Sequence, residues 1–322
     1  CRGVSCGNSG LVFLMSHWRQ SFSYLEACLI FFGAILTVPT SITTTSAAAR
    51  DRAYPLADGM TQRIAIGVEY NGRHFHGWQR QASPDLPTVQ GALEPAISRV
   101  ASHPVQLVCA GRTDAGVHAS AQVAHFDVAV ERLNKAWVAG VNSLLVPAVR
   151  VVWAAPVEAL FHARFSAVAR QYQYWIHNTQ IAPGIFAGQL THFPRPLDAA
   201  LMNQEVQCLL GEQDFSAFRG SGCQSNSPWR DVHKANVYRR GNLVIFEITA
   251  NAFLLHMVRN IASGLHQVGL GAAQGFLQAL LGAKDRQQLG ITAPAQGLYL
   301  AEVAYPQQDF PAPPLPPLIR RR

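Results

Sequence analysis

The segment CAGRTDAGVH (109–118) places an arginine, a threonine and a carboxylate between two glycines. Flanking glycines disfavour a regular helix or strand, so the segment is predicted to form a tight turn. An arginine nearby keeps an aspartate ionised, and an ionised carboxylate exposed on a turn can act as a covalent nucleophile. Arg112 and Asp114 are therefore candidate catalytic residues. The alternative is that Asp114 only bonds its own backbone in an Asx-turn.

Five further segments combine arginines with aromatic side chains or polar loops. Each one alone is explained by core packing or by a solvated loop. Together they are typical of a surface that binds RNA with unstacked bases. The segments are HFHGWQRQ (74–81), FHARF (161–165), QYQYW (171–175), SGCQSNSPWR (221–230) and HMVRN (256–260).

The composition indicates a folded chain with an acidic partner. The 322 residues suit one large domain or two smaller ones. The net charge of +7 favours nucleic acid first and a membrane surface second. Only three lysines are present, so arginine carries almost all of the positive charge, which suits phosphate binding and base stacking but also fits an arginine-rich genome. Cysteines and histidines show neither C-x-x-C nor H-E-x-x-H spacing, so we expect a reducing compartment and no metal site.

Both ends of the chain differ from its middle. The apolar run ACLIFFGAILTV (27–38) is too short to span a bilayer comfortably, so no membrane segment is expected. It could be the core of a signal peptide. We favour an upstream extension or misplaced start over residues 1–59, expected to be disordered, with the functional chain opening near Met60. The proline-rich and basic tail, 307–322, is expected to be extended.

Hydrophobic periodicity predicts strands that alternate with helices. Such an order predicts an α+β fold with helices packed on a mixed sheet, in two roughly similar halves. Thr88 is expected to cap the first helix, and Pro95 to bend or shorten it. Strands are expected at 63–70, 121–128, 168–178, 242–250 and 298–306, and helices at 88–101, 198–211 and 252–269.

AGRTDAGVHA, together with GWQRQ, FHARFSA, NAFLLHMVRNI and QGLYL, resembles the TruA-type tRNA pseudouridine synthases. The resemblance runs from about Arg63 to Pro306, with the motifs in the order of that family. It implies an α+β fold with a mixed, mainly antiparallel sheet and helices packed on it. The two similar halves, 60–165 and 166–306, would surround a central cleft. It also implies a cytoplasmic homodimer that needs no cofactor.

The resemblance assigns roles to individual residues. Asp114 matches the catalytic aspartate, and Arg112 the arginine that flips the target nucleotide out and takes its place. Tyr172 matches the tyrosine that stacks on the flipped uracil, and Arg259 the arginine that pairs with the aspartate. The implied substrate is uridine at positions 38, 39 and 40 of the tRNA anticodon arm. The implied tRNA contacts are Arg132, Phe161, His162, Ala163, Arg164, Phe165, Gly222, Cys223, Gln224, Ser225 and Asn226.

Two other function classes compete with this reading. A non-catalytic RNA-binding protein could use the same scaffold, but it would not need all four of Asp114, Arg112, Tyr172 and Arg259. An exported hydrolase would explain the apolar run as a signal peptide. The sequence, however, contains no second carboxylate motif, no G-x-S-x-G nucleophile motif and no metal-binding motif. One departure from the family is Leu255, where relatives often carry a polar or aromatic residue, and we expect its effect to be modest.

Overall fold

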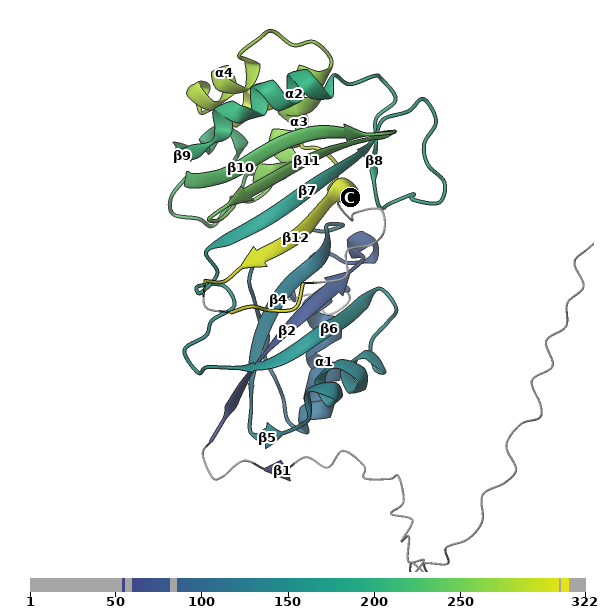
Figure 1. The fold of residues 1–322 in the computed structure, drawn as a ribbon, viewed down its shortest axis with the longest axis vertical. Coiled ribbons are helices and arrows are strands. Elements are labelled where there is room, and N and C mark those ends of the chain that lie inside the picture. The colour runs from purple at the N-terminus through teal and green to yellow at the C-terminus, as the bar shows by residue number, and fades with distance from the viewer. Residues whose placement is uncertain (1–53, 56–59, 82–85, 307, 313–322) are drawn as a thin grey trace, which may run out of the picture. The chain divides into compact units, whose positions relative to one another are not determined.

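The computed structural model describes residues 54–55, 60–81, 86–306 and 308–312, all within one compact unit. The centre of this unit is a ten-stranded, mainly antiparallel sheet (Figure 1). Its strand order is β6-β2-β4-β12-β7-β11-β10-β9, with β3 paired to β4 and β8 paired to β7. The pairs β12–β4 and β7–β8 are parallel. The last long strand, β12, therefore joins strands from the first part of the chain to those from the second.

The strands of this sheet vary in length. Those of the first part of the chain are β2 (Gln62–Tyr70), β3 (Val108–Cys109), β4 (His118–Val128) and β6 (Val149–Val157). Those of the second part are β7 (Ala169–His177), β8 (Thr191–His192), β9 (Gly211–Asp214), β10 (Trp229–Arg240), β11 (Leu243–Ala250) and β12 (Leu298–Ala304). A separate two-stranded sheet pairs β1 (Tyr54–Pro55) with β5 (Val130–Glu131).

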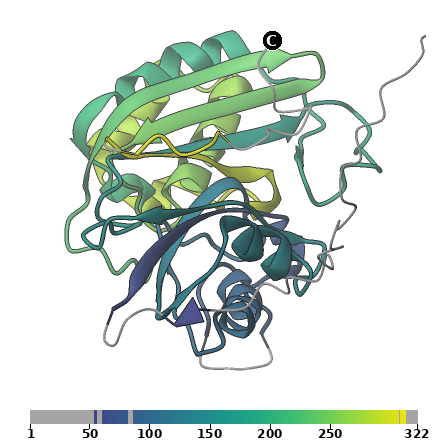
Figure 2. The ribbon, with the colours of Figure 1, turned by 60° about the horizontal axis from the view of Figure 1, so that its bottom comes forward.

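Helices gather over two regions of the sheet, with α1 near β2 and β6 and the others over the part with β7 and β10, where α2 and α3 contact strands and α4 packs on α2 and α3 (Figures 1 and 2). The α-helices are α1 (Val89–Ala101), α2 (Ala199–Val206), α3 (Met257–Gly269) and α4 (Phe276–Ala283). A π-helical turn, η2, covers Ala136–Gly140. Short 3-10 turns are η1 (Gly72–His74), η3 (Gln207–Leu209), η4 (Ser216–Phe218), η5 (Arg286–Leu289) and η6 (Ala295–Gly297).

The alternation of side chains along each strand separates the two faces of the sheet. On β2, Ile64 and Ile66 join the main hydrophobic core, whereas Ala65 belongs to a smaller cluster. Leu93 of α1 and Ile261 of α3 lie in the same main core, so both helices cover one face. We call this the helical face and the other the open face.

The structure confirms the predicted strands to within three residues at either end. It also confirms Thr88 as the cap of α1, since its side chain accepts a hydrogen bond from Gly91 N at 3.1 Å. The expected shortening at Pro95 is wrong, because α1 continues to Ala101. Pro95 is exposed, so the helical carbonyl that it leaves without a donor lies on the solvent side and can bond water.

Two predicted helices are too long. Ala252–His256 is not helical, and α3 begins only at Met257, because His256 adopts a left-handed conformation with φ 61°. The apolar residues before it are satisfied by tertiary burial instead, as in Leu254, which is 4% exposed. The helix α2 ends at Val206, and Gly211 opens strand β9 rather than closing a helix.

The predictions for the chain ends fall almost wholly outside the described residues. Within 1–59 only Tyr54–Pro55 is described, as the strand β1. The apolar run 27–38 and residues 313–322 lie outside the described part. In the ranges that are described, no helix is long and apolar enough to cross a membrane.

Three buried histidines predict a loss of stability in acid. Burial lowers the pKa of His118, His125 and His266 to about 4. An unfolded histidine titrates near 6.5, so between these values the unfolded chain binds protons that the folded chain does not. The free energy of unfolding is expected to reach its highest value, as far as these histidines are concerned, above about pH 6.5. It should fall toward pH 4 by up to roughly 3 kcal/mol for each ring.

The variant His266→Phe isolates one of these contributions. The imidazole stacks on Phe193 with ring centroids 4.9 Å apart, and its Nε2 has no hydrogen-bond partner among the described residues. A phenyl ring can therefore replace it without losing a hydrogen bond. Between pH 7 and 4.5 the variant should lose about 2 kcal/mol less unfolding free energy than the parent protein. Urea unfolding at several pH values measures this, and parallel curves would contradict it.

Candidate active site

The turn that carries Arg112 and Asp114 connects β3 to β4 and is fixed by a neighbouring loop. Trp78 N donates to Thr113 O at 3.0 Å. That approach requires glycine before the tryptophan, because a Cβ on Gly77 would lie 2.6 Å from Thr113 O, and Gly77 has φ +89°. Gly116 closes the turn with φ +79°, a region that favours glycine. The glycines read from the sequence thus serve the close approach of two backbones.

Buried side chains hold the turn from beneath. Gln122 Nε2 donates to Gly111 O at 2.6 Å, and the hydroxyls of Tyr70 and Thr113 are 2.8 Å apart. Gln122 and Tyr70 are almost fully buried, so these bonds are shielded from water. The turn therefore presents Arg112, which is exposed, and Asp114, which is partly exposed, from a fixed backbone.

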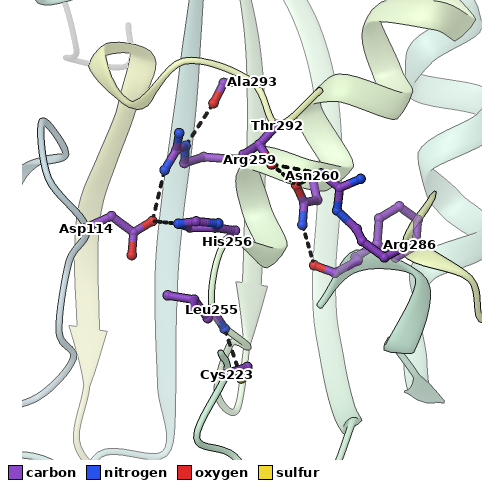
Figure 3. Close-up of polar contacts among 10 residues, drawn as sticks. Asp114, Cys223, Leu255, His256, Arg259, Asn260, Arg286, Thr292 and Ala293 are labelled. Carbon is purple, nitrogen blue, oxygen red and sulfur yellow. Dashed lines mark hydrogen bonds and ion pairs between the residues drawn. The ribbon is translucent and has the colours of Figure 1, made fainter. Parts of the chain in front are cut away.

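The Asp114 carboxylate contacts two side chains at the start of α3 (Figure 3). Arg259 Nη1 donates to Asp114 Oδ2 at 3.2 Å, and His256 Nε2 lies 3.5 Å from the same oxygen. The Arg259 guanidinium is oriented by a second bond, from Nε to Ala293 O at 2.8 Å. Among the described residues the Asp114 carboxylate has no hydrogen bond to its own turn, so the Asx-turn alternative is wrong. His256 lay within a segment that the sequence marked, but its contact with Asp114 was not predicted.

The start of α3 is itself anchored by Asn260, which is fully buried. Its Nδ2 donates to Phe218 O at 2.8 Å. Its Oδ1 accepts from Thr292 Oγ1 at 2.8 Å and from Arg286 Nη2 at 3.1 Å (Figure 3). Because Arg259 precedes Asn260, this network fixes the helical turn that delivers the guanidinium to Asp114.

Tyr172 lies on β7 and faces the same cleft as Asp114. Its ring packs edge-on against Phe253, with centroids 5.0 Å apart. Burial, and then the negative charge of Asp114, raise the pKa of the phenol. Tyr172 is therefore a neutral aromatic surface at neutral pH.

These residues lie in a cleft of about 800 Å³. Its walls come from both parts of the chain. The first part contributes residues 78–79 and 107–114, and the second part contributes residues 222–225 and 252–258. A nucleotide fits such a volume. Besides Asp114 the cleft is lined by four arginines, so it attracts anions. They are Arg112, Arg164, Arg170 and Arg230.

Arg170 was not singled out from the sequence, yet it joins three segments of the cleft wall. Its buried guanidinium donates to Ala110 O at 3.0 Å, Arg164 O at 2.5 Å, and Ala167 O and Asn251 O at 2.9 Å each. Desolvation lowers the pKa of Arg170, and the carbonyls satisfy the donors. No spacing rule in a sequence predicts such a contact, since its acceptors are backbone atoms.

The structure divides the predicted tRNA contacts of loop 158–166. Arg164 lines the cleft, Phe165 is 75% exposed, and His162 is partly exposed. Phe161 and Ala163 are instead buried in the smaller cluster on the open face, 6% and 0% exposed. Only three of the five side chains can therefore meet a ligand in this arrangement.

The other predicted contacts are also divided. Gly222, Cys223, Gln224 and Ser225 line the cleft, and Asn226 is exposed outside its lining. Arg132 lies elsewhere. Its guanidinium donates to Val100 O, near the end of α1, at 2.8 and 3.1 Å.

Leu255, the departure from the family pattern, contributes its backbone to the cleft wall. Its N–H donates to Cys223 Sγ at 3.4 Å (Figure 3). Burial raises the pKa of the Cys223 thiol, but hydrogen bonds, those from Leu255 and Ser225 first, leave it lowered on balance. A backbone contact of this kind does not depend on the side chain at position 255.

The arrangement holds one carboxylate, with a guanidinium and an imidazole beside it, in a cleft that arginines line. No group of three potential metal ligands occurs in the part of the chain that the structure describes. The Asp114 carboxylate, with Arg259 and His256 beside it, supports acid–base chemistry or nucleophilic attack on a bound nucleotide.

Comparison with known proteins agrees with this geometry. A family model described as tRNA pseudouridine synthase matches residues 66–166 and 206–306. Proteins named tRNA pseudouridine synthase A include one from Photorhabdus laumondii, 49% identical over 259 residues, which cover 80% of this chain and 97% of that protein. One from Aeromonas salmonicida is 51% identical over 80% of this chain and 95% of its own length. One from Coxiella burnetii is 51% identical over 79% of this chain and 97% of its own length.

Among solved structures, the crystal structure of a Cbf5-Nop10-Gar1 complex matches with a TM-score of 0.30 and 12% identity, over 74% of this chain and 48% of that one. That likeness is too weak to carry an argument. The family match and the relatives decide the question: the chain belongs to the tRNA pseudouridine synthase family, whose enzymes isomerise uridine to pseudouridine.

Proposed function

We propose that this protein isomerises uridine to pseudouridine at positions 38, 39 and 40 of the tRNA anticodon stem-loop, by base flipping and with Asp114 as nucleophile. One observation carries the site assignment: Asp114 is paired with Arg259 at 3.2 Å in a cleft that Tyr172 and Arg112 also line. The relatives are named tRNA pseudouridine synthase A, and these names support tRNA as the substrate class. The resemblance of the motifs supports the anticodon arm.

The reaction rearranges one nucleotide and needs one carboxylate. The N1–C1′ bond breaks, the base turns over, and a C5–C1′ bond forms. The C5 proton is lost and N1 gains a proton, so atoms and electrons balance without an oxidant or reductant. Asp114 could attack the sugar or the base, or assist elimination, and each route requires it ionised. Arg259 donates a hydrogen bond to Oδ2 of this carboxylate at 3.2 Å, so a positive charge lies directly beside it.

Arg112 and Tyr172 have separate roles in the proposed base flipping. Extruding a nucleotide costs a few kcal/mol, because stacking and pairing are lost. Arg112 is exposed and close in sequence to Asp114, so it can occupy the space that the base leaves. Tyr172 offers its ring as a stacking surface for the flipped uracil. These two contacts offset part of the extrusion cost.

The wider tRNA surface follows from exposure and charge. Arg164, His162 and Phe165 can meet the tRNA directly, and so can the loop 222–226. Phe161, Ala163 and Arg132 belong to that surface only if they contact the tRNA through backbone atoms or after their segments change conformation. The domain boundaries 60–165 and 166–306, a homodimer, a cytoplasmic location and catalysis without a cofactor complete the proposal.

The decisive experiment measures tritium release from tRNA labelled at uracil C5, followed by mapping of the modified positions. Release with modification at 38–40 is the expected result. Tight tRNA binding without release would favour the non-catalytic RNA-binding alternative. Release with modification elsewhere in the tRNA would keep the reaction and overturn the anticodon assignment.

The variant Arg112→Ala tests the flipping role. Without the guanidinium the vacated space in the stack stays empty, and the rate of modification should fall about 10- to 100-fold. The side chain is exposed, so the free energy of unfolding should change by less than about 0.5 kcal/mol. Tritium release and urea unfolding measure the two effects, and a variant with unchanged rate would remove Arg112 from the mechanism.

A further inference from the structure

After β12 the chain crosses the open face of the sheet, where residues 305–306 and 308–312 form a segment that we call the strap (Figure 1). Phe310 is its anchor. Its ring stacks on Trp153, with centroids 4.5 Å apart and planes at 17°. It meets Phe161 at 5.7 Å and Tyr305 at 5.5 Å, both edge-on. Phe310 thus packs against Trp153, Phe161 and Tyr305, which we call the aromatic cluster and of which Tyr305 itself opens the strap.

The sheet is shaped to hold this cluster. A Cβ on Gly67 of β2 would lie 2.1 Å from Trp153 Nε1, so the indole rests directly on the glycine. Trp153 and Tyr305 are each 9% exposed, and Phe161 is 6% exposed. Trp153 and Phe161 lie on a face that none of the described helices covers, and Phe310 of the strap packs on both rings. The contact is therefore a built part of the fold.

The same cluster supports loop 158–166. Tyr305 OH donates to Ala163 O at 2.7 Å, and its ring lies 5.1 Å from that of Phe161. On the other side of this loop, Arg164 lines the cleft and lies over the Phe165 ring at 5.5 Å. The loop therefore joins the strap to the cleft, with Phe161 and Ala163 directed to the strap and Arg164 to the cleft.

We propose that Phe310 is a positioning residue, which holds loop 158–166 in the conformation that places Arg164 in the cleft. The proposal rests on the proposed function, because it takes Arg164 as a contact of the tRNA. It explains why a loop that resembles a tRNA-binding motif buries two of its five residues. Those two residues bind the strap, and the strap acts on the substrate through them.

Hydrogen–deuterium exchange without RNA tests the structural step. The amides of Phe161, Ala163 and Ser166 are hydrogen-bonded within the loop or to His125. In Phe310→Ala, residues 158–166 should exchange faster than in the parent protein, while β2 and β4 keep their exchange rates. The variant Gln308→Ala, in the same strap, is the matched control and should leave the loop unchanged. Unchanged exchange in Phe310→Ala would overturn the proposal.

Steady-state tritium release tests the functional step in the full chain. If Phe310→Ala leaves about one-tenth of the loops in the competent conformation, KM for tRNA should rise about 10-fold. The kcat should stay within about two-fold, because Asp114 and Arg259 are untouched. Phe310→Leu keeps an apolar anchor and should lie between the two proteins. It also serves if Phe310→Ala does not fold.

A double-mutant cycle with Arg164→Ala separates this inference from the proposed function. If the strap acts through Arg164, the double variant should have the KM of Arg164→Ala within about two-fold. If the KM increases of the two single variants multiply in the double variant, the strap does not act through Arg164 and the proposal is overturned. It is also overturned if Phe310→Ala has a lower molecular mass in solution than the parent protein and this change accounts for its loss of activity. An unchanged KM in Arg164→Ala would instead overturn the tRNA contact of Arg164, and the exchange experiment would then decide the strap alone.

Discussion

Replacing Asp114 with asparagine is expected to abolish tritium release from C5-labelled tRNA, a loss of roughly 10⁴-fold or more in kcat. Asparagine has the size of aspartate, and its side-chain oxygen can still accept the hydrogen bond from Arg259. It cannot act as a nucleophile or take a proton, because it is neutral. The loss would therefore come from the chemistry. Release should be measured with enzyme in excess, so that slow residual turnover is detected.

Binding distinguishes this loss from a loss of substrate. The tRNA affinity of Asp114→Asn should stay within a few-fold of that of the parent protein, since removing a negative charge from a positive cleft does not weaken anion binding. The control is Asp198→Asn. Asp198 caps α2 through bonds to Ala200 N and Leu201 N, and asparagine caps equally well. Measurable turnover by Asp114→Asn near the rate of this control would refute the nucleophile assignment.

The variant Arg259→Met should produce the second large effect. It removes the cation from Asp114 and also the bond to Ala293 O. Hydrogen bonds to charged groups contribute about 1.5–3 kcal/mol, which corresponds to roughly a 10- to 150-fold loss in kcat. Both side chains are partly buried, 15% and 23% exposed, so water replaces the guanidinium only incompletely. Single-turnover release at saturating enzyme measures this effect apart from tRNA binding.

Two companions separate charge from geometry at this position. Arg259→Lys keeps a positive charge but lacks the fork that serves both acceptors, so an intermediate rate is expected. Arg99→Met removes an exposed arginine from α1 and controls for the general loss of charge. If Arg259→Met matches Arg99→Met in rate, the ion pair with Asp114 has no part in the chemistry.

The sequence predicted the strands well and the ends of helices poorly. The alternation of apolar and polar residues along a strand is a local property of the sequence, so it could locate β2, β4, β7, β11 and β12. The helix expected over 252–269 was too long because its apolar residues fit a helical pattern as well as a buried loop. The left-handed conformation of His256 ends that ambiguity, and it depends on what surrounds the residue. The long strands β6 and β10 were not predicted, nor were the short strands β1, β3, β5, β8 and β9.

Within the site, the motifs supplied the residue types and the fold supplied their partners. The turn at 111–116, Tyr172 and Arg259 could be selected from the sequence, because glycines, arginines and aromatic residues recur there in the order of a known family. His256 and Arg170 could not be selected. Their roles arise from a contact with Asp114 and from bonds to four backbone carbonyls, and no spacing encodes either.

The sequence by itself determined the family, the candidate nucleophile and the periodicity of the strands. The tertiary structure decided which groups meet. Asp114 and Arg259 are 145 residues apart in the chain. They come together because β12 inserts between β4 and β7 and because α3 packs on the face to which Tyr172 points. The structure also turned Phe161 and Ala163 away from the cleft and toward Phe310. Side-chain period follows from local backbone geometry, whereas such contacts follow from the burial of apolar surface across the whole sheet.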